Sequence, residues 1–219
     1  MTMRRRKSVL RNLKSRFGRT LFFLPFMALA TLNHGFSHEP TNSKKISGPQ
    51  RREVRIPIRD FRLIDQNGRS FDFKTVRDKV VVLAFAYTTC PDVCPLTTAA
   101  MRQIQMGFDR IERSSVYFIT VTTDPEVDNP KVLAVYAKRY GVDLSDWAFV
   151  TGEEVVLRGI WKNFGVRVVR KARGLVDHTS LTAVIDRTGT MRFAYYGTAP
   201  DPKVVIEDVR SLLAHRSNS

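Results

Sequence analysis

One run of eight apolar residues, at positions 80–87, restricts what this chain can fold into more than any other feature. It reads Val-Val-Val-Leu-Ala-Phe-Ala-Tyr and contains no charged side chain. A half-exposed strand would show a polar residue at every second position, so this run predicts a strand that is buried on both faces. Such a strand needs a layer of helices on each side of its sheet, which indicates an α/β domain.

A helical pattern follows this strand, because Met101, Ile104, Phe108 and Ile111 fall on one side of a helix over residues 95–111. The alternation then continues. We predict strands at residues 116–121, 148–150, 181–185 and 191–195, and helices at residues 130–140, 155–164 and 202–213. This βαβα unit followed by a ββα unit predicts a thioredoxin-like fold, with a central mixed sheet flanked by helices.

Turn and cap residues mark two further features. Gln66-Asn67-Gly68 separates two apolar stretches within residues 61–73, which predicts an N-terminal hairpin extension of the sheet. The second predicted helix is expected to begin after Asp128 or Asn129, since either side chain can cap a helix N-terminus. Gly141 is expected to end it.

The N-terminal segment carries much of the net charge of +15. Eight cations and no acidic residue lie in residues 1–30, and residues 21–32 form an uncharged, mostly apolar run. This order is typical of a signal peptide, and the same segment, if uncleaved, would act as a membrane anchor. We therefore predict a signal peptide or N-terminal membrane anchor at residues 1–32, a flexible linker at residues 33–53 and one folded domain at residues 54–216.

Export restricts the function classes. The charge by itself would suggest a nucleic-acid partner, but an exported domain does not meet nucleic acid, so none is expected. We expect a periplasmic protein that is either soluble or attached to the inner membrane by its N-terminal segment. The Arg-rich, acid-poor start also fits a mitochondrial presequence, which would place the domain at the mitochondrial inner membrane, facing the intermembrane space.

Cys90 and Cys94 are the only cysteines, and they lie where the buried strand turns into the first helix. A helix N-terminus offers partial positive charge and free backbone N–H groups, which lower the pKa of a thiol and favour the thiolate. Thiolates serve both metal binding and disulfide exchange. A purely structural disulfide is the third interpretation, but closing so short a loop would stabilise the fold by only about 2 kcal/mol.

A soft metal held by two thiolates needs at least one more donor. The histidines are His34, His38, His178 and His215. The first two lie in or beside the export segment and His215 lies in the C-terminal tail, where a solvated surface role fits each of them. His178 precedes the penultimate strand, at the edge of a thioredoxin-like sheet that faces the cysteine turn. It is therefore the candidate donor, with a structural role as the alternative.

Three segments together resemble the SCO/SenC family of copper-binding proteins. They are Thr89-Cys90-Pro91-Asp92-Val93-Cys94-Pro95, Thr123-Asp124-Pro125-Glu126-Val127-Asp128-Asn129-Pro130 and Asp177-His178-Thr179. The resemblance extends over residues 58–213 and implies that Cys90, Cys94 and His178 bind copper. It further implies that the protein is a copper metallochaperone that helps to assemble the dinuclear copper centre of cytochrome c oxidase. The implied partners are the copper-receiving oxidase subunit, a copper donor and a thiol reductant.

The donor types agree with copper. Two thiolates and one imidazole form a soft site of low coordination number that suits Cu(I), with Cu(II) as a second state, whereas structural zinc normally takes four protein ligands. Zinc would need Asp92, Asp177 or water to complete its shell. Both carboxylates are otherwise expected just outside the ligands, where Asp177 would accept a hydrogen bond from the ring of His178 and orient it, with a solvated surface position as the alternative.

A thiol–disulfide oxidoreductase is the main alternative to a metallochaperone. It would use Cys90 and Cys94 as attacking and resolving thiols to reduce the cysteines of a copper-receiving protein, and it would not need His178. A thiol peroxidase is disfavoured, because Leu83 and Tyr87 stand where its Pro and Thr would be. We therefore expect a metallochaperone rather than an enzyme, with disulfide exchange as the activity that the same cysteines would support.

A basic stretch precedes the candidate histidine. Between Val155 and Val176 there are six cations and no acidic residue. They are Arg158, Lys162, Arg167, Arg170, Lys171 and Arg173. Such a stretch would steer an acidic partner towards the metal, and an ordinary solvated surface is an equally good interpretation.

Overall fold

The structure is a computed structural model that describes residues 50–214. The expected export segment and most of the expected linker lie outside the described residues, as do residues 215–219. The strands are β1 (Gln50–Pro57), β2 (Arg62–Asp65), β3 (Ser70–Asp72), β4 (Val80–Ala86), β5 (Val116–Thr122), β6 (Trp147–Thr151), β7 (Val168–Arg170), β8 (Val176–His178), β9 (Leu181–Ile185) and β10 (Thr190–Tyr196). The helices are α1 (Val93–Met106), α2 (Arg110–Ser114), α3 (Pro130–Tyr140), α4 (Glu154–Asn163) and α5 (Pro202–Ala214).

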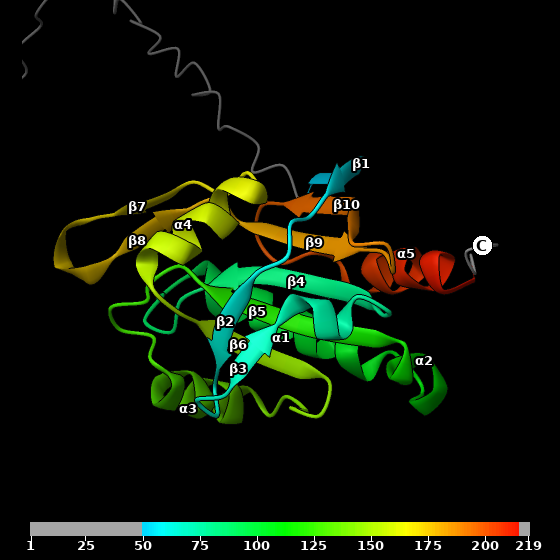
Figure 1. Cartoon of the computed structure of the whole chain (residues 1–219), viewed down its shortest axis with the longest axis horizontal. Coiled ribbons are helices and arrows are strands. Elements are labelled where there is room, and N and C mark those ends of the chain that lie inside the picture. The colour runs from blue at the N-terminus through cyan, green and yellow to red at the C-terminus, as the bar shows by residue number, and fades with distance from the viewer. Residues whose placement is uncertain (1–49, 215–219) are drawn as a thin grey trace, which may run out of the picture. The chain divides into compact units, whose positions relative to one another are not determined.

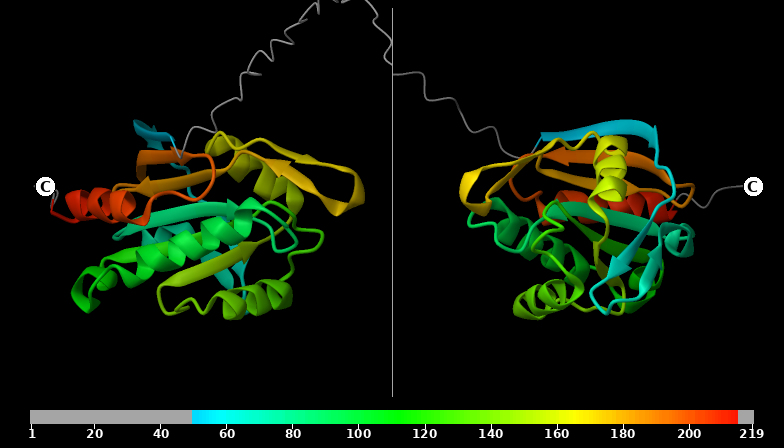
Figure 2. Two further views of the ribbon diagram at one scale, coloured as in Figure 1. Left: turned by 180° about the vertical axis from the view of Figure 1, so that it is seen from behind. Right: turned by 60° about the vertical axis from the view of Figure 1, so that its left-hand side comes forward.

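Eight of the strands form one mixed sheet in the order β1-β10-β9-β4-β5-β6-β2-β3. β4, β5 and β6 run parallel, whereas β9 pairs with β4, and β10 with β9, in the antiparallel sense. The apolar sides of α1, α3 and α5 pack on one face of this sheet and that of α4 packs on the other (Figures 1 and 2). The predicted thioredoxin-like arrangement, a central mixed sheet between helices, is confirmed.

β4 lies in the middle of the sheet, between β9 and β5. All seven of its residues are buried. Val82 packs in the core beneath α1 and α5, and its neighbour Leu83 packs in the core beneath α4. The uninterrupted apolar run therefore reflects burial on both faces, and the chain leaves the sheet at the carboxyl end of β4 after Ala86.

The predicted N-terminal hairpin is present as β2 and β3. The Asp65 carboxylate stabilises its turn, because one oxygen accepts hydrogen bonds from the N–H groups of Asn67 and Arg69 at 2.8 Å each. Gly68 has a φ of 75°, in the left-handed region that glycine adopts without strain. β2 also pairs with β6, so the hairpin extends one edge of the sheet.

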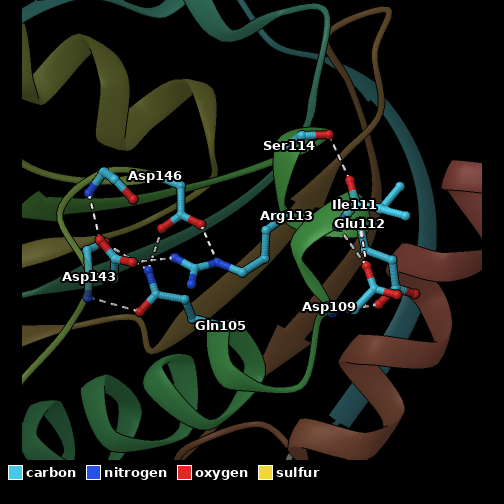
Figure 3. A network of polar contacts seen from close by, with 9 residues as sticks. Gln105, Asp109, Ile111, Glu112, Arg113, Ser114, Asp143 and Asp146 are labelled. Carbon is cyan, nitrogen blue, oxygen red and sulfur yellow. Dashed lines mark hydrogen bonds and ion pairs between the residues drawn. The ribbon is translucent and has the colours of Figure 1, made fainter.

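The helix predicted at residues 95–111 is two helices, α1 and α2. The break lies at Asp109, because its carboxylate accepts hydrogen bonds from two N–H groups at the start of α2. Glu112 returns the interaction by accepting from the Asp109 N–H at 3.0 Å, which completes a capping box (Figure 3). Arg113 of α2 then donates to Asp146 at 2.7 Å and ties α2 to the chain before β6.

α3 has the predicted bounds. Asn129 is its N-cap, with a side-chain oxygen that accepts from the Val132 N–H at 3.2 Å. Gly141 ends the helix with a φ of 59°. Asp128, the alternative cap in the sequence, faces the cysteine turn instead.

Two features of the fold were not predicted. β1 begins at Gln50, inside the range expected to be linker, so the folded domain starts before residue 54. Most of its residues are exposed, and its first four, Gln50-Arg51-Arg52-Glu53, are all polar and lack the apolar alternation by which a strand is recognised. β7 and β8, between α4 and β9, form a separate two-stranded sheet that the basic sequence did not indicate. Among residues 50–214, no helix has the length and apolar character needed to cross a bilayer.

The pairing of β1 predicts where the chain can be shortened. A chain that begins at Lys44 keeps every described strand, and we expect it to unfold at the same urea concentration as the full chain. A chain that begins at Ile58 loses the Arg51 guanidinium, which donates to the buried Asp208 carboxylate at 2.7 and 2.8 Å. Its free energy of unfolding should fall by about 3 kcal/mol or more, because β10 loses the strand that it pairs with and the Asp208 carboxylate loses its cation. Urea unfolding followed by circular dichroism gives the unfolding midpoint of each shortened chain. Equal midpoints for the two would contradict this role of β1.

Candidate metal site

The cysteine turn joins the end of β4 to the start of α1. Cys90 lies in the turn and Cys94 in the first turn of α1, and both are free thiols. Both are buried, with 8% of Cys90 and 1% of Cys94 exposed. The Cys94 N–H donates to the Cys90 sulfur at 3.5 Å. The first N–H groups of a helix have no helical partner, so this start of α1 holds one sulfur beside the residue that carries the other.

His178 ends β8 and reaches the cysteine turn from a different part of the chain. Its Nε2 lies 3.6 Å from the Sγ of Cys94, and its Nδ1 lies 3.1 Å from the carbonyl oxygen of Thr179. A carbonyl oxygen only accepts hydrogen bonds, so Nδ1 carries the ring proton and the Nε2 lone pair faces Cys94. Burial lowers the pKa of His178, which favours the neutral ring that a metal requires.

The two thiols differ in acidity. Burial by itself would raise the pKa of Cys90, but hydrogen bonds from the Cys94 thiol and from the N–H groups of Cys94 and Asp92 outweigh it, so that this pKa is lowered. Burial, and after it the neighbouring Cys90 sulfur, raise the pKa of Cys94. Cys90 is therefore the thiol that ionises first, and Cys94 keeps its proton.

A cavity of about 410 Å³ is lined by Cys90 and His178 and also by Asp92 and Asp177, whereas Cys94 is buried outside its lining. Asp92 is exposed, and its side chain makes no capping hydrogen bond to α1. The Asp177 side chain is 55% exposed and lies 3.8 Å from the Lys171 ammonium. The carbonyl of Thr179, rather than Asp177, contacts the Nδ1 of His178. Both carboxylates thus line the cavity, and within residues 50–214 no hydrogen bond joins Asp177 to the ring of His178.

Asp128 is a residue of the site that sequence reasoning missed. It is fully buried, and its carboxylate accepts hydrogen bonds from the Thr88 hydroxyl at 2.5 Å, the Thr88 N–H at 3.2 Å and the Thr122 hydroxyl at 2.6 Å. Thr88 begins the cysteine turn after β4 and Thr122 ends β5, so Asp128 fastens the turn to the end of the neighbouring strand. Two hydroxyls at the carboxyl ends of adjacent parallel strands are the sequence signal that could have indicated such an acceptor.

The donor set fits a soft ion. The described residues, 50–214, hold no group of three or more His, Cys, Asp or Glu side chains already arranged around a metal position. They bring together Cys94 and His178, with Cys90 next to Cys94. Two sulfurs and an imidazole lone pair suit Cu(I), whereas the carboxylates that a hard cation prefers lie at the exposed rim of the cavity. His34, His38 and His215 lie outside the described residues.

Known proteins share this fold and part of its sequence. Residues 50–214 match the family model SCO1/SenC. A SCO1/SenC family lipoprotein from Bacillus anthracis has a TM-score of 0.68 and 27% identity, over 74% of this chain and 98% of that one. BsSco, a member of the Sco family of cytochrome c oxidase assembly proteins, has a TM-score of 0.65 and 27% identity, over 75% of this chain and 98% of its own.

A relative whose structure contains copper is also similar. ScoI of Bradyrhizobium japonicum, with copper bound, has a TM-score of 0.60 and 25% identity, over 71% of this chain and 99% of that one. All three proteins are covered almost completely, so the likeness extends through the whole domain and includes the elements that carry the cysteines and His178. With a family match over most of its 219 residues, the chain belongs to the SCO1/SenC family.

Proposed function

We propose that this protein is a copper metallochaperone, which binds one copper ion through Cys90, Cys94 and His178 and helps to assemble the dinuclear copper centre of cytochrome c oxidase. The observation that carries this proposal is the 3.6 Å approach of the His178 Nε2 to the Cys94 sulfur, with the ring tautomer that leaves the lone pair on that nitrogen. Two of the three donors, Cys90 and His178, line a cavity that opens to the surface, as a site that must pass its ion to another protein requires.

The donor set favours Cu(I) over zinc. A structural zinc site takes four protein ligands, so the rim carboxylates of Asp92 or Asp177 would have to join the two sulfurs and the imidazole. Asp177 is instead paired with Lys171, and Asp92 is exposed to solvent. Cu(II) prefers more nitrogen and oxygen ligands and would draw on water or on these same carboxylates. Cu(I) is therefore the ion that the three donors can bind without a further ligand.

The relatives support the copper assignment and suggest the partners. ScoI of Bradyrhizobium japonicum binds copper, and BsSco belongs to a family that assembles cytochrome c oxidase. We accordingly propose the copper-receiving subunit of the oxidase as the acceptor. A copper donor must load the site, and a thiol reductant must act before it, because only reduced cysteines bind the ion.

We further propose that the domain works outside the cytoplasm, close to a membrane. The basic and then apolar order of residues 1–32 supports export, and the Bacillus anthracis relative is a lipoprotein. A cleaved signal peptide would leave a soluble periplasmic domain, and an uncleaved one would attach it to the inner membrane. The mitochondrial intermembrane space is the alternative location.

Thiol–disulfide exchange is the second candidate function, because the two thiols differ in pKa and in exposure. Cys90 has the lowered pKa and the larger exposure that an attacking thiol needs, and Cys94 lies directly behind it. In an exchange, the Cys90 thiolate would attack the disulfide of the copper-receiving protein, which breaks that S–S bond, releases one of the partner's thiolates and forms a mixed disulfide. Cys94 would then displace that sulfur, so that Cys90 and Cys94 become a disulfide and the partner's two cysteines are reduced.

Replacement of the imidazole separates the two functions. His178→Ala removes one of three donors, and we expect Cu(I) affinity to fall by more than about 100-fold, since even residues that only support metal ligands contribute 10–100-fold. Dithiol exchange with a small disulfide should continue. Competition titration with a Cu(I) chelator measures the affinity, with His215→Ala as the control that keeps it. Wild-type affinity in His178→Ala would show that the ligand assignment is wrong.

Copper binding is expected to require the dithiol form. A Cys90–Cys94 disulfide removes both sulfur donors in one step and leaves a single imidazole, so the oxidised protein should bind almost no Cu(I). The measurement is copper content after gel filtration, with the oxidation state of the cysteines established by mass spectrometry. Stoichiometric copper on fully oxidised protein would contradict the proposal.

The acidity difference predicts the order in which the thiols react. With a limiting amount of iodoacetamide near pH 7, Cys90 should be alkylated well before Cys94, because only thiolates react and the pKa of Cys90 is the lower one. As pH rises, its reaction rate should reach a plateau at a lower pH than that of an ordinary thiol. Peptide mapping by mass spectrometry follows both residues. Faster alkylation of Cys94 would contradict the attacking role of Cys90.

A further inference from the structure

The strand that carries His178 does not belong to the main sheet. β7 and β8 pair only with each other, in a register that sets Val168 opposite His178 and Arg170 opposite Val176. Figures 1 and 2 show this hairpin projecting from one end of the domain. A two-stranded hairpin is at best marginally stable by itself. The position of His178 therefore depends on what fastens the hairpin to the rest of the protein.

One fastening is apolar and lies at the cysteine turn. Val176 is buried in a small cluster with Tyr87 and both cysteines, and its N–H donates to the Tyr87 hydroxyl at 3.3 Å. Val168 of β7 also packs, partly buried, against the core and against this cluster. Beside it lies a cavity of about 190 Å³, lined by residues of the hairpin, of α4 and of the chain after β5. Its lining comprises Thr123, Pro125, Glu154, Arg158, Trp161 and three hairpin residues, Val168, Arg170 and Val176.

An ion pair joins the hairpin to the chain after β5 beside this cavity. The Arg170 guanidinium donates to the Asp124 carboxylate and lies 3.2 Å from the Glu126 carboxylate. Asp124 is 0% exposed, and its second oxygen, Oδ2, has no hydrogen-bond partner in the described part of the chain. A buried carboxylate without a cation is strongly unfavourable, so Asp124 holds Arg170 firmly.

We propose that the Arg170–Asp124 ion pair positions the copper ligand His178 by fastening the β7–β8 hairpin to the chain after β5. The inference rests on the proposed function and adds two positioning residues to it. Neither residue touches a sulfur or the imidazole in the structure. Arg170 of β7 lies opposite Val176 of β8, and Val176 comes two residues before His178. The ion pair therefore holds one strand of the hairpin, and the Val176 contact holds the other strand at the directly opposite position. Release of either strand would change the distance between the His178 Nε2 and the Cys94 sulfur.

A double-mutant cycle with His178 tests this proposal. Arg170→Gln, His178→Ala and the double variant are prepared in the full chain, and their Cu(I) affinities are measured by competition titration. We expect Arg170→Gln to weaken Cu(I) binding about tenfold, the lower end of the range for residues that support metal ligands. In the His178→Ala background it should have no further effect, because the ligand that it positions is gone. Arg170→Lys keeps the charge and should restore most of the affinity.

Arg158→Gln is the matched control. Arg158 lines the same cavity, but it pairs with Glu154 of its own helix and not with the hairpin, so its loss should leave Cu(I) affinity unchanged. The ring ¹⁵N resonances of His178 in the metal-free protein provide a second readout. They should shift or broaden in Arg170→Gln and not in Arg158→Gln.

A second variant serves as a control for misfolding, because Arg170→Gln leaves the buried charge of Asp124 uncompensated. Arg170→Gln/Asp124→Asn removes both charges, and thermal unfolding establishes that it is folded. It should show the same tenfold loss of affinity. An unchanged affinity in this variant, or an equal loss with and without His178, would overturn the proposal while leaving the ligand set intact. Wild-type affinity in His178→Ala would instead overturn the ligand set, and the positioning role with it.

Discussion

Burial of β4 on both faces is the constraint on which the rest of the structure depends. Seven consecutive buried residues require helices above and below the sheet, and the chain can leave only at the end of the strand. α1 starts soon after that point, so its unpaired N–H groups lie beside the turn between strand and helix. Cys90 and Cys94 fall in this short interval. The buried carboxylate of Asp128 then fixes the turn to the end of β5.

The same geometry makes the two sulfurs chemically different. Cys90 receives hydrogen bonds and ionises readily, whereas Cys94 is deeper and faces the unprotonated nitrogen of His178. If Cys94 binds copper as proposed, its thiol must lose its proton to solvent, because the pKa of this thiol is raised while that of the neighbouring imidazole is lowered. Binding through this sulfur would therefore release a proton.

Sequence reasoning succeeded where one local pattern determines the structure. The apolar run of β4, the bounds of α3 between Asn129 and Gly141, and the place of the cysteines all follow from nearby residues. It failed where the partner is distant in sequence. The exposed strand β1 is defined by its pairing with β10, and the contacts of Asp128 with Thr88 span 40 residues. His178 was identified as a donor candidate by position and by resemblance, but the separate hairpin that carries it was not predicted.

Arg170 shows why a run of charges is a weak guide to function. In the sequence it is one of six cations without an acidic neighbour, and both interpretations, a steering surface and a solvated face, treat those cations alike. In the structure they separate: Arg158 pairs within its own helix, Lys171 pairs with Asp177 at the rim of the cavity, and Arg170 pairs with the buried Asp124. The proposed donors consequently come from two different parts of the fold. The cysteines lie beside the central strand β4, and the histidine lies on a two-stranded hairpin outside the main sheet, an arrangement that would suit a site which passes its ion to another protein.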